Sequence, residues 1–181
     1  PGFATIETTS TTTIEVQFNV ALDTGTIEAS DLEVAGSDTP DSVDTSNAGV
    51  DGGLVVLTMA SADPFGTGAT PSVHVASEIL DLAGNDLSSP TSATDATDGV
   101  APTMDSAITG DSADGNSKAK DQLVVTFSEE ISDASVDPAD FSVAGVTPDE
   151  VSVSSSEVTL TLPEKMDSGA TPNVDLVAAV E

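Results

Sequence analysis

Residues 14–18 (Ile-Glu-Val-Gln-Phe) and 123–127 (Leu-Val-Val-Thr-Phe) decide the fold class of this chain. Apolar side chains occupy every second position in both stretches, which is the period of a β-strand that buries one face. The alternation predicts that Ile14, Val16 and Phe18 share a face directed toward a core. No stretch keeps a helical period for longer than one turn, so we expect an all-β protein.

The two stretches belong to an internal repeat. Asp31–Gly36 (Asp-Leu-Glu-Val-Ala-Gly) follows the first and Asp140–Gly145 (Asp-Phe-Ser-Val-Ala-Gly) follows the second, with 18 positions between the Phe and the Gly in both copies. The motif Gly-Ala-Thr-Pro-x-Val begins at Gly68 and returns at Gly169, 101 positions later. Copy two has eight extra residues before its Phe and eight fewer after its Gly. Insertions of this kind belong in loops that join shared strands.

A Ser/Thr/Ala/Asp-rich segment at 88–100 separates the copies, and we interpret its first part as an edge strand or an extended stretch and 97–101 as a short linker. The domains are then 1–100 and 101–181. The first copy continues with Asp-Leu-Ala-Gly-Asn at 81–85, which the second copy lacks. We therefore expect the second domain to be incomplete at its C-terminal strand and the chain to be a fragment of a longer repeat protein. A shorter last domain with a genuine C-terminus is the alternative.

The alternation also gives the expected strand positions, and it places His74, between Val73 and Val75, on a solvent-facing side. Single helical turns are expected at 28–31 and 137–140. Strands are predicted at 4–8, 13–19, 32–35, 54–59, 72–75 and 79–80 in the first domain, and at 104–109, 122–128, 141–144, 150–154, 157–162 and 173–177 in the second.

The charge balance excludes several classes of function. The chain has 32 Asp and Glu against 3 Lys and Arg, for a formal net charge of −29, so phosphate backbones are repelled and we expect no nucleic-acid partner. It has no Cys and one His, which excludes disulfides, thiolate sites and multi-histidine metal sites. No apolar run approaches the roughly 20 residues of a membrane span. The 38% of hydrophobic residues fall in alternating runs, which favours a folded chain over a disordered one.

The acidity also indicates an environment. Lys and Arg are nearly absent, Asp outnumbers Glu by 21 to 11, and the apolar residues are mostly small. This composition resembles that of salt-adapted, haloarchaeal proteins; a marine or calcium-rich surface protein is the alternative. At molar salt the Debye length falls to roughly 3 Å, which screens distant carboxylates from one another. We expect the protein to be folded in molar NaCl or KCl and destabilised in low salt.

The segment 110–121 (Gly-Asp-Ser-Ala-Asp-Gly-Asn-Ser-Lys-Ala-Lys-Asp) is a candidate metal site. Asp111, Asp114, Asn116 and Asp121 can supply oxygen ligands to Ca²⁺ or Mg²⁺ around a glycine turn. The spacing is not that of an EF-hand, and two lysines lie within the segment. The alternative is an Asp-Gly hairpin turn without metal.

Asp81-Leu82-Ala83-Gly84-Asn85 predicts a tight turn. Asp81 can accept hydrogen bonds from the amides that follow it, and both Gly84 and Asn85 can take positive φ.

Three motifs carry a family resemblance. They are Val-Thr-Phe-Ser-Glu at 125–129, Asp-Pro-Ala-Asp-Phe-Ser-Val at 137–143 and Asp-Leu-Ala-Gly-Asn at 81–85. Together they resemble the bacterial and archaeal Ig-like repeats of surface proteins, both those of S-layer proteins and those of swimming-motility surface proteins. The resemblance implies two tandem Ig-like β-sandwich domains with Greek-key connections, used as spacer, coat or adhesion units. Residues 18–20 (Phe-Asn-Val) depart from the usual Phe-Ser-Glu.

These observations favour a non-catalytic structural or adhesive module of an extracellular cell-surface assembly, such as an S-layer, a filament or an adhesin stalk. The expected partners are other copies of the chain or neighbouring repeats, with cations bridging acidic faces. We expect no enzyme, because paired carboxylates need a cleft with opposed environments to act as catalysts. A surface or tail-fibre domain of a virus of a halophilic host, and an accessory module of a secreted enzyme, are the alternatives.

Overall fold

The computed structural model describes residues 1–35, 38–50, 52–62, 64–87, 92–110, 121–167, 169–178 and 180. The chain divides into two compact units, Pro1–Val100 and Ala101–Glu181, which are described separately below. Both are built from β-strands joined by loops and three-residue 3₁₀ turns, which confirms the predicted all-β class. Within the described ranges, no helix is long and apolar enough to cross a membrane.

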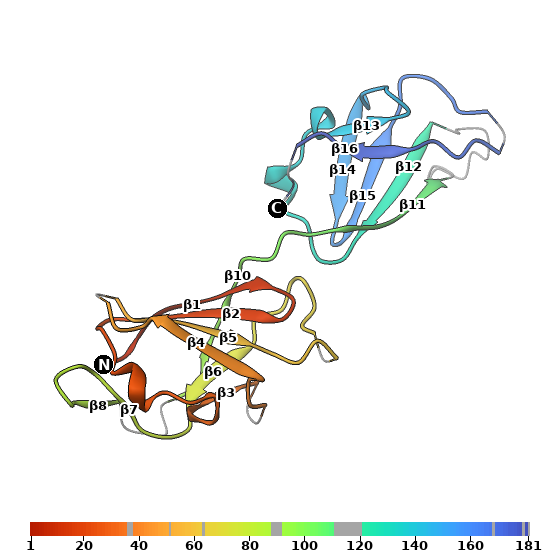
Figure 1. Ribbon diagram of the computed structural model, residues 1–181. Helices are drawn as coiled ribbons and strands as arrows, with labels where there is room; N and C mark the ends of the chain where they lie inside the picture. The colour runs from red at the N-terminus through yellow and green to blue at the C-terminus, as the bar shows by residue number, and fades with distance from the viewer. Residues whose placement is uncertain are drawn as a thin grey trace. The chain divides into compact units, whose positions relative to one another are not determined.

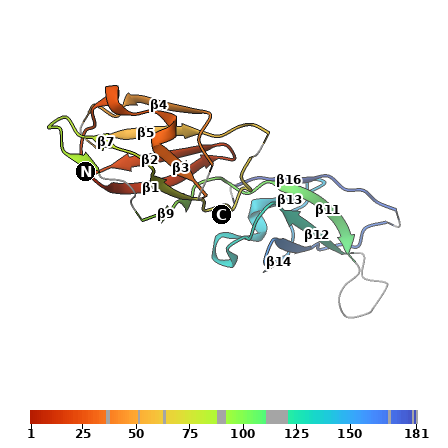
Figure 2. The same ribbon diagram turned by 90° about the horizontal axis from the view of Figure 1, so that it is seen from below.

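Unit 1 contains a larger and a smaller sheet, with a short hairpin beside them. The larger sheet has the order β10-β1-β2-β5-β4, and Figure 2 shows β4, β5, β2 and β1 side by side. The smaller sheet has the order β3-β6-β9, with β3 and β6 below the larger sheet in Figure 1. The elements are β1 (Phe3–Ser10), β2 (Thr13–Phe18), η1 (Thr24–Thr26), η2 (Ala29–Asp31), β3 (Leu32–Val34), β4 (Ser42–Asn47), β5 (Leu54–Thr58), β6 (Ser72–Val75), β7 (Ile79–Leu80), β8 (Asp86–Leu87), β9 (Thr94–Asp95) and β10 (Thr97–Asp98).

The connections of unit 1 repeatedly cross between the two sheets. The chain leaves β2 for β3, returns for the β4–β5 hairpin, and crosses again to β6, so the strands β1-β2-β5-β4 face β3-β6-β9. This four-plus-three order is that of a seven-stranded Greek-key sandwich. Ala96, between β9 and β10, is 3% exposed where the chain passes from one sheet to the other. The final strand β10 then pairs in parallel with β1.

The core of unit 1 lies between its two sheets, as the alternation predicts. Ile14, Val16 and Phe18 of β2 are fully buried, and they belong to one cluster with Val34 and Val73 of the smaller sheet. The rings of Phe3 and Phe18 are 5.2 Å apart between centroids. Because each buried aliphatic or aromatic side chain contributes about 1.5–3 kcal/mol, this layer is the main source of the sandwich's stability.

Unit 2 repeats this architecture strand for strand over most of its length. Its larger sheet has the order β11-β12-β15-β14, which matches β1-β2-β5-β4, and its smaller sheet pairs β13 with β16 as β3 pairs with β6. A register irregularity between Phe3 and Thr5 of β1 recurs between Met104 and Ser106 of β11. The elements are β11 (Met104–Gly110), β12 (Gln122–Phe127), η3 (Asp133–Ser135), η4 (Pro138–Asp140), β13 (Phe141–Val143), β14 (Glu150–Ser154), β15 (Glu157–Thr161) and β16 (Val174–Leu176).

The core of unit 2 uses the same positions. Leu123, Val125 and Phe127 of β12 are at most 2% exposed, and the Phe127 ring meets that of Phe141 edge-on at 6.5 Å. The two units differ at one side of the sandwich. Among the described residues of unit 2, no strand pairs with β16 as β9 pairs with β6, or with β11 as β10 pairs with β1.

Two sequence predictions need correction. The segment 97–101, expected to be a linker, begins with β10, which is bound to β1 through Glu7 and Thr8. Strand β4 was not expected, because it shows no alternation: Val43 is the single apolar residue in 42–47. It is an edge strand of the sheet, and most of its side chains are exposed. The turns expected at 28–31 and 137–140 are confirmed as the capped 3₁₀ turns η2 and η4.

Candidate functional sites

The predicted cation loop falls mostly on residues that the structure does not describe. Asp111, Asp114 and Asn116 lie outside the described residues, and Asp121 is half-buried at the start of β12. The backbone carbonyl of Asp121 accepts a hydrogen bond of 2.7 Å from the amide of Leu162, which ties the loop end to the end of β15. Across the described ranges, no three His, Asp or Glu side chains form a group able to hold a metal ion. The cation site stays a prediction.

The turn at Asp81 forms as expected, with one exception. Oδ1 of Asp81 accepts hydrogen bonds from the amides of Ala83 and Asn85, both at 2.8 Å, and Oδ2 accepts one from Nδ2 of Asn85 at 2.8 Å. The bonds from the Asn85 side chain and amide lower the pKa of the Asp81 carboxyl. Gly84 has a φ of +77°, but Asn85 does not take positive φ, contrary to the prediction. This carboxylate therefore serves the turn.

His74 lies on the outer face of β6 but is more covered than expected. Its Nε2 lies 3.1 Å from Oε2 of Glu33, which is directly opposite on β3, and its side chain is 17% exposed. Its neighbours Val73 and Val75 are fully buried on the other face. A cross-strand contact of this kind holds the two strands together.

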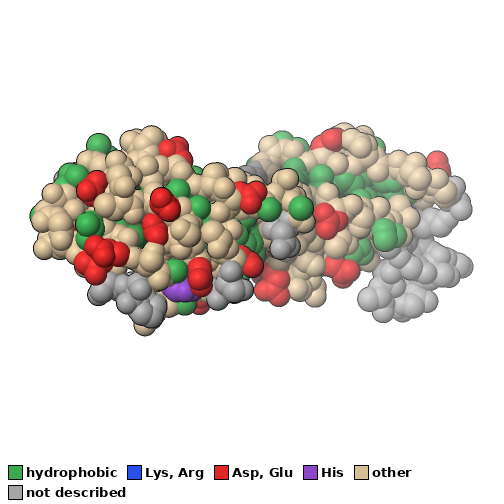
Figure 3. Space-filling model, turned by 60° about the horizontal axis from the view of Figure 1, so that its bottom comes forward, with side chains coloured by type: hydrophobic (Ala, Val, Ile, Leu, Met, Phe, Trp, Pro, Cys, Tyr) green, Lys and Arg blue, Asp and Glu red, His purple; other side chains and the backbone are tan. Residues whose placement is uncertain are grey.

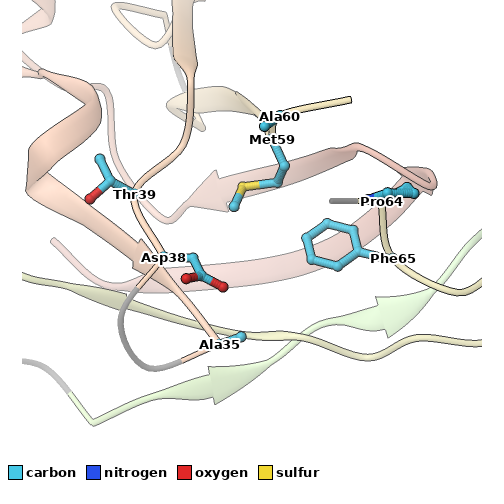
Figure 4. A pocket seen from close by; sticks show the side chains of 7 residues that line it. All are labelled: Ala35, Asp38, Thr39, Met59, Ala60, Pro64 and Phe65. Carbon is cyan, nitrogen blue, oxygen red and sulfur yellow. The ribbon is translucent and has the colours of Figure 1, made fainter. Parts of the chain in front are cut away.

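A pocket in unit 1 opens where the β3–β4 and β5–β6 connections meet. It has a volume of about 340 Å³ and is lined by Ala35, Asp38, Thr39, Met59, Ala60, Pro64 and Phe65. Figure 4 shows the side chains of Met59, Phe65 and Asp38 directed into the same space. Sequence reasoning missed this pocket, because its walls come from two loops that carry no strand pattern.

Unit 2 has a pocket at the corresponding place, but with different chemistry. Its volume is about 480 Å³, and its walls are mostly apolar, from Val143, Ala144, Val146, Leu162, Pro163, Glu164, Met166 and Pro172. Ala144 and Leu162 correspond to Ala35 and Met59 of unit 1, whereas the carboxylate comes from a different place: Glu164 after β15, not a residue in the position of Asp38. Each pocket thus has one carboxylate in its wall, but the two carboxylates stand at different positions of the repeat.

Acidic side chains dominate the charged surface. In Figure 3 they are spread over the visible face, between uncharged side chains, and do not gather into one patch. With 32 acidic residues against 3 Lys and Arg in the sequence, most carboxylates have no cationic side chain available as a partner. A net charge far from zero destabilises a compact state through self-repulsion, and salt screens that repulsion.

Comparison with known proteins gives little further information. No family model and no curated protein matches the chain. Among solved structures, the chain is similar to domains 1–6 of the surface layer protein SbsC, at 14% sequence identity and a TM-score of 0.43. The match covers 97% of this chain, which spans 32% of the length of that chain.

Proposed function

We propose that this chain is a non-catalytic structural module of a cell-surface assembly, built from Ig-like repeats and adapted to high salt. The observation that carries the proposal is the repetition of one sandwich design in tandem, with the register of β1 and β2 reproduced in β11 and β12. Repetition of a rigid unit lengthens a protein without adding a new site. Tandem repetition of one unit is what a spacer or a coat protein requires.

The structural roles of the polar side chains also support this proposal. Asp81 accepts the hydrogen bonds of a turn, and Glu33 pairs with His74, so both of these carboxylates stabilise local structure. The carboxylates that line the two pockets, Asp38 and Glu164, do not occupy corresponding positions of the repeat. A repeated ligand site would repeat its polar contacts, whereas a structural module needs only to repeat its core.

The proposal is tested by locating the protein in its source. Antibodies raised against the folded 181-residue chain are applied to intact cells of the source organism at its growth salinity. We expect labelling of intact cells that is lost after brief external proteolysis. Labelling confined to purified virions, or to a secreted fraction that carries hydrolase activity, would overturn the cell-surface assignment.

A biochemical experiment tests the assembly itself. Sedimentation in molar NaCl with divalent cations, compared with the same buffer after chelation, measures whether acidic faces are bridged by ions. We expect association to weaken on chelation. Unchanged sedimentation under both conditions would contradict cation bridging between copies.

A further inference from the structure

The larger sheet of each unit ends at one side in a hairpin strand, which is β4 in unit 1 and β14 in unit 2. The sheet orders are β10-β1-β2-β5-β4 and β11-β12-β15-β14, so each of these strands has one hydrogen-bonded neighbour among the described strands. Figure 1 shows β14 beside β15, at the side of the sheet opposite β11. Unit 1 also contains β9 and β10, and β4 is still the last strand of its sheet. The open edge at β14 therefore belongs to the architecture that both units share.

The β4 edge of unit 1 is irregular and charged. Its pairing with β5 has a register irregularity between Asp44 and Asn47. Asp44 lies in the middle of the strand, opposite Val56, and its side chain is exposed. A bulge in an edge strand and a charged side chain on it are two features that prevent a sheet from pairing with another chain. Unit 1 thus has a protected edge.

The β14 edge of unit 2 lacks both features. All five residues of Glu150–Ser154 (Glu-Val-Ser-Val-Ser) pair with β15 in an uninterrupted register. Ser152 stands at the position that Asp44 occupies in unit 1. Within the described part of the chain, no backbone hydrogen bond joins 150–154 to a residue outside β15. Because alternate residues of an edge strand direct their N–H and C=O groups away from the neighbouring strand, β14 presents a regular row of unpaired backbone groups.

The side chains of β14 are compatible with a second copy of the same strand. In the antiparallel register that pairs all five residues, Ser152 lies opposite Ser152 of the other copy, and each Glu150 lies opposite Ser154. No carboxylate of the strand then faces another, although the chain has a formal charge of −29. On the inner face, Val151 of one copy lies opposite Val153 of the other. Both valines are partly buried against the core of unit 2, and the pairing covers surface that is still exposed on them.

We propose that β14 binds β14 of a second copy of this chain in antiparallel orientation, so that the two larger sheets become one continuous sheet. The contact is isologous, because both copies use the same surface. Main-chain hydrogen bonds supply the affinity of such strand addition, and alternate side chains supply the specificity. The inference rests on the proposed function, since it names one contact by which copies of a surface module join.

The contact is small, and this decides how it is tested. Two five-residue strands bury much less than the roughly 1,200 Å² of a stable interface. The net charge also opposes the approach of two copies in dilute buffer. We therefore expect weak association that strengthens in molar salt, where the Debye length is roughly 3 Å. The experiment has to capture a weakly populated dimer.

Disulfide trapping tests the register, because the chain has no cysteine of its own. Ser152→Cys places two cysteines opposite each other at a Cα separation of about 4.5–5.5 Å, which a disulfide can span. Ser154→Cys is the matched control, since it is an exposed serine on the same face of β14 whose two copies lie roughly 14 Å apart in this register. The chain is kept in roughly 2 M NaCl with a chelator, which screens charge and removes cation bridges. In a glutathione redox buffer, we expect the Ser152→Cys dimer to form at least about tenfold faster.

A mixture of two variants tests the direction of the strands. Glu150→Cys and Ser154→Cys, each in a separate chain, should give the mixed dimer in excess over both homodimers, because the antiparallel register places these two positions opposite each other. A parallel pair would instead place each position opposite itself and give homodimers.

The unmodified chain supplies a measurement that does not depend on any variant. The ¹⁵N-labelled chain is diluted from roughly 1 mM to roughly 0.1 mM at the same salt concentration, and its amide resonances are followed. We expect concentration-dependent shifts at residues 150–154 of β14. Residues 42–47 of β4 are the internal control and should not shift, since their edge is protected.

Each outcome decides for or against edge pairing. Equal cross-linking of Ser152→Cys and Ser154→Cys, an excess of homodimers in the mixture, or amide shifts that are absent from 150–154 or equal in β4 would overturn the proposal. These failures are distinct from failure of the proposed function. Labelling of intact cells without preferential cross-linking would reject the β14 contact and leave the cell-surface assignment standing, whereas cross-linking without labelling would do the reverse.

Discussion

Glu7 of β1 and Glu15 of β2 lie directly opposite each other on the outer face of the larger sheet of unit 1. The corresponding pair in unit 2 is Ile108 with Val124. Like charges opposite one another on neighbouring strands destabilise a sheet by a few tenths of a kcal/mol to about 1 kcal/mol. Unit 1 thus contains a local repulsion that unit 2 lacks at the same place.

Removing that repulsion should stabilise unit 1 in a salt-dependent way. We expect Glu15→Gln to raise the free energy of unfolding by about 0.5 kcal/mol in dilute buffer and by much less in molar NaCl, because salt screens the pair. Denaturant titrations at both salt concentrations measure the difference. Glu157→Gln is the control, since Glu157 lies opposite Thr126 and Ser154. An equal gain from both variants would contradict the pairwise explanation.

Salt should also stabilise the chain as a whole. With a formal charge of −29, we expect its melting temperature to rise steadily from dilute buffer to molar NaCl. Calorimetry in NaCl and in a neutral sugar of equal osmolality separates screening from general solute exclusion. A melting temperature indifferent to ionic strength would remove the case for salt adaptation.

A turn in unit 2 contains removable backbone strain. Ala144 and Gly145 have φ of +51° and +85°, and Val143 and Val146 exchange backbone hydrogen bonds across them, as in a type I′ hairpin. Asn tolerates the left-handed region better than Ala, so Ala144→Asn should stabilise unit 2 by about 0.5–1 kcal/mol. Ala139→Asn, at an exposed position in η4, is the control and should give no gain. Chemical denaturation measures both.

The Asp81 turn should weaken in acid. The pKa of Asp81 is lowered in the folded protein by its bonds to Asn85, so its contribution is present above the ordinary value of 3.8. The contribution is lost as the pH falls through the folded pKa. We expect Asp81→Asn to flatten the acid limb of the unfolding free energy below that value, with Asp86→Asn, on an exposed side chain of β8, leaving it unchanged. Identical acid limbs in the original chain and Asp81→Asn would refute this role.

The parts of the fold that follow from local pattern were predictable, and those that depend on distant pairing were not. The alternation of apolar residues at Ile14, Val16 and Phe18 predicts a buried strand face, and all three side chains are fully buried. Thr97 and Asp98 have no such pattern, since β10 is defined by its pairing with β1 at the other end of the unit. No local signal identifies a strand whose side chains are short and polar.

The same division applies to the candidate sites. The turn at Asp81 was predictable because its partners lie within four residues. The pocket around Met59 and Phe65 was not predictable, because its walls come from two separate connections of the chain.

The parallel pairing of β1 and β10 has a mechanical consequence. Because the two strands run in the same direction, their outer ends, at Pro1 and Val100, leave the pair at opposite ends. Tension along the chain therefore slides one strand past the other and loads the contacts at Glu7–Thr97 and Thr8–Asp98 together. Antiparallel neighbours pulled from one end would instead separate bond by bond. A force applied to the two ends of unit 1 would therefore meet the resistance of a sheared pair of strands.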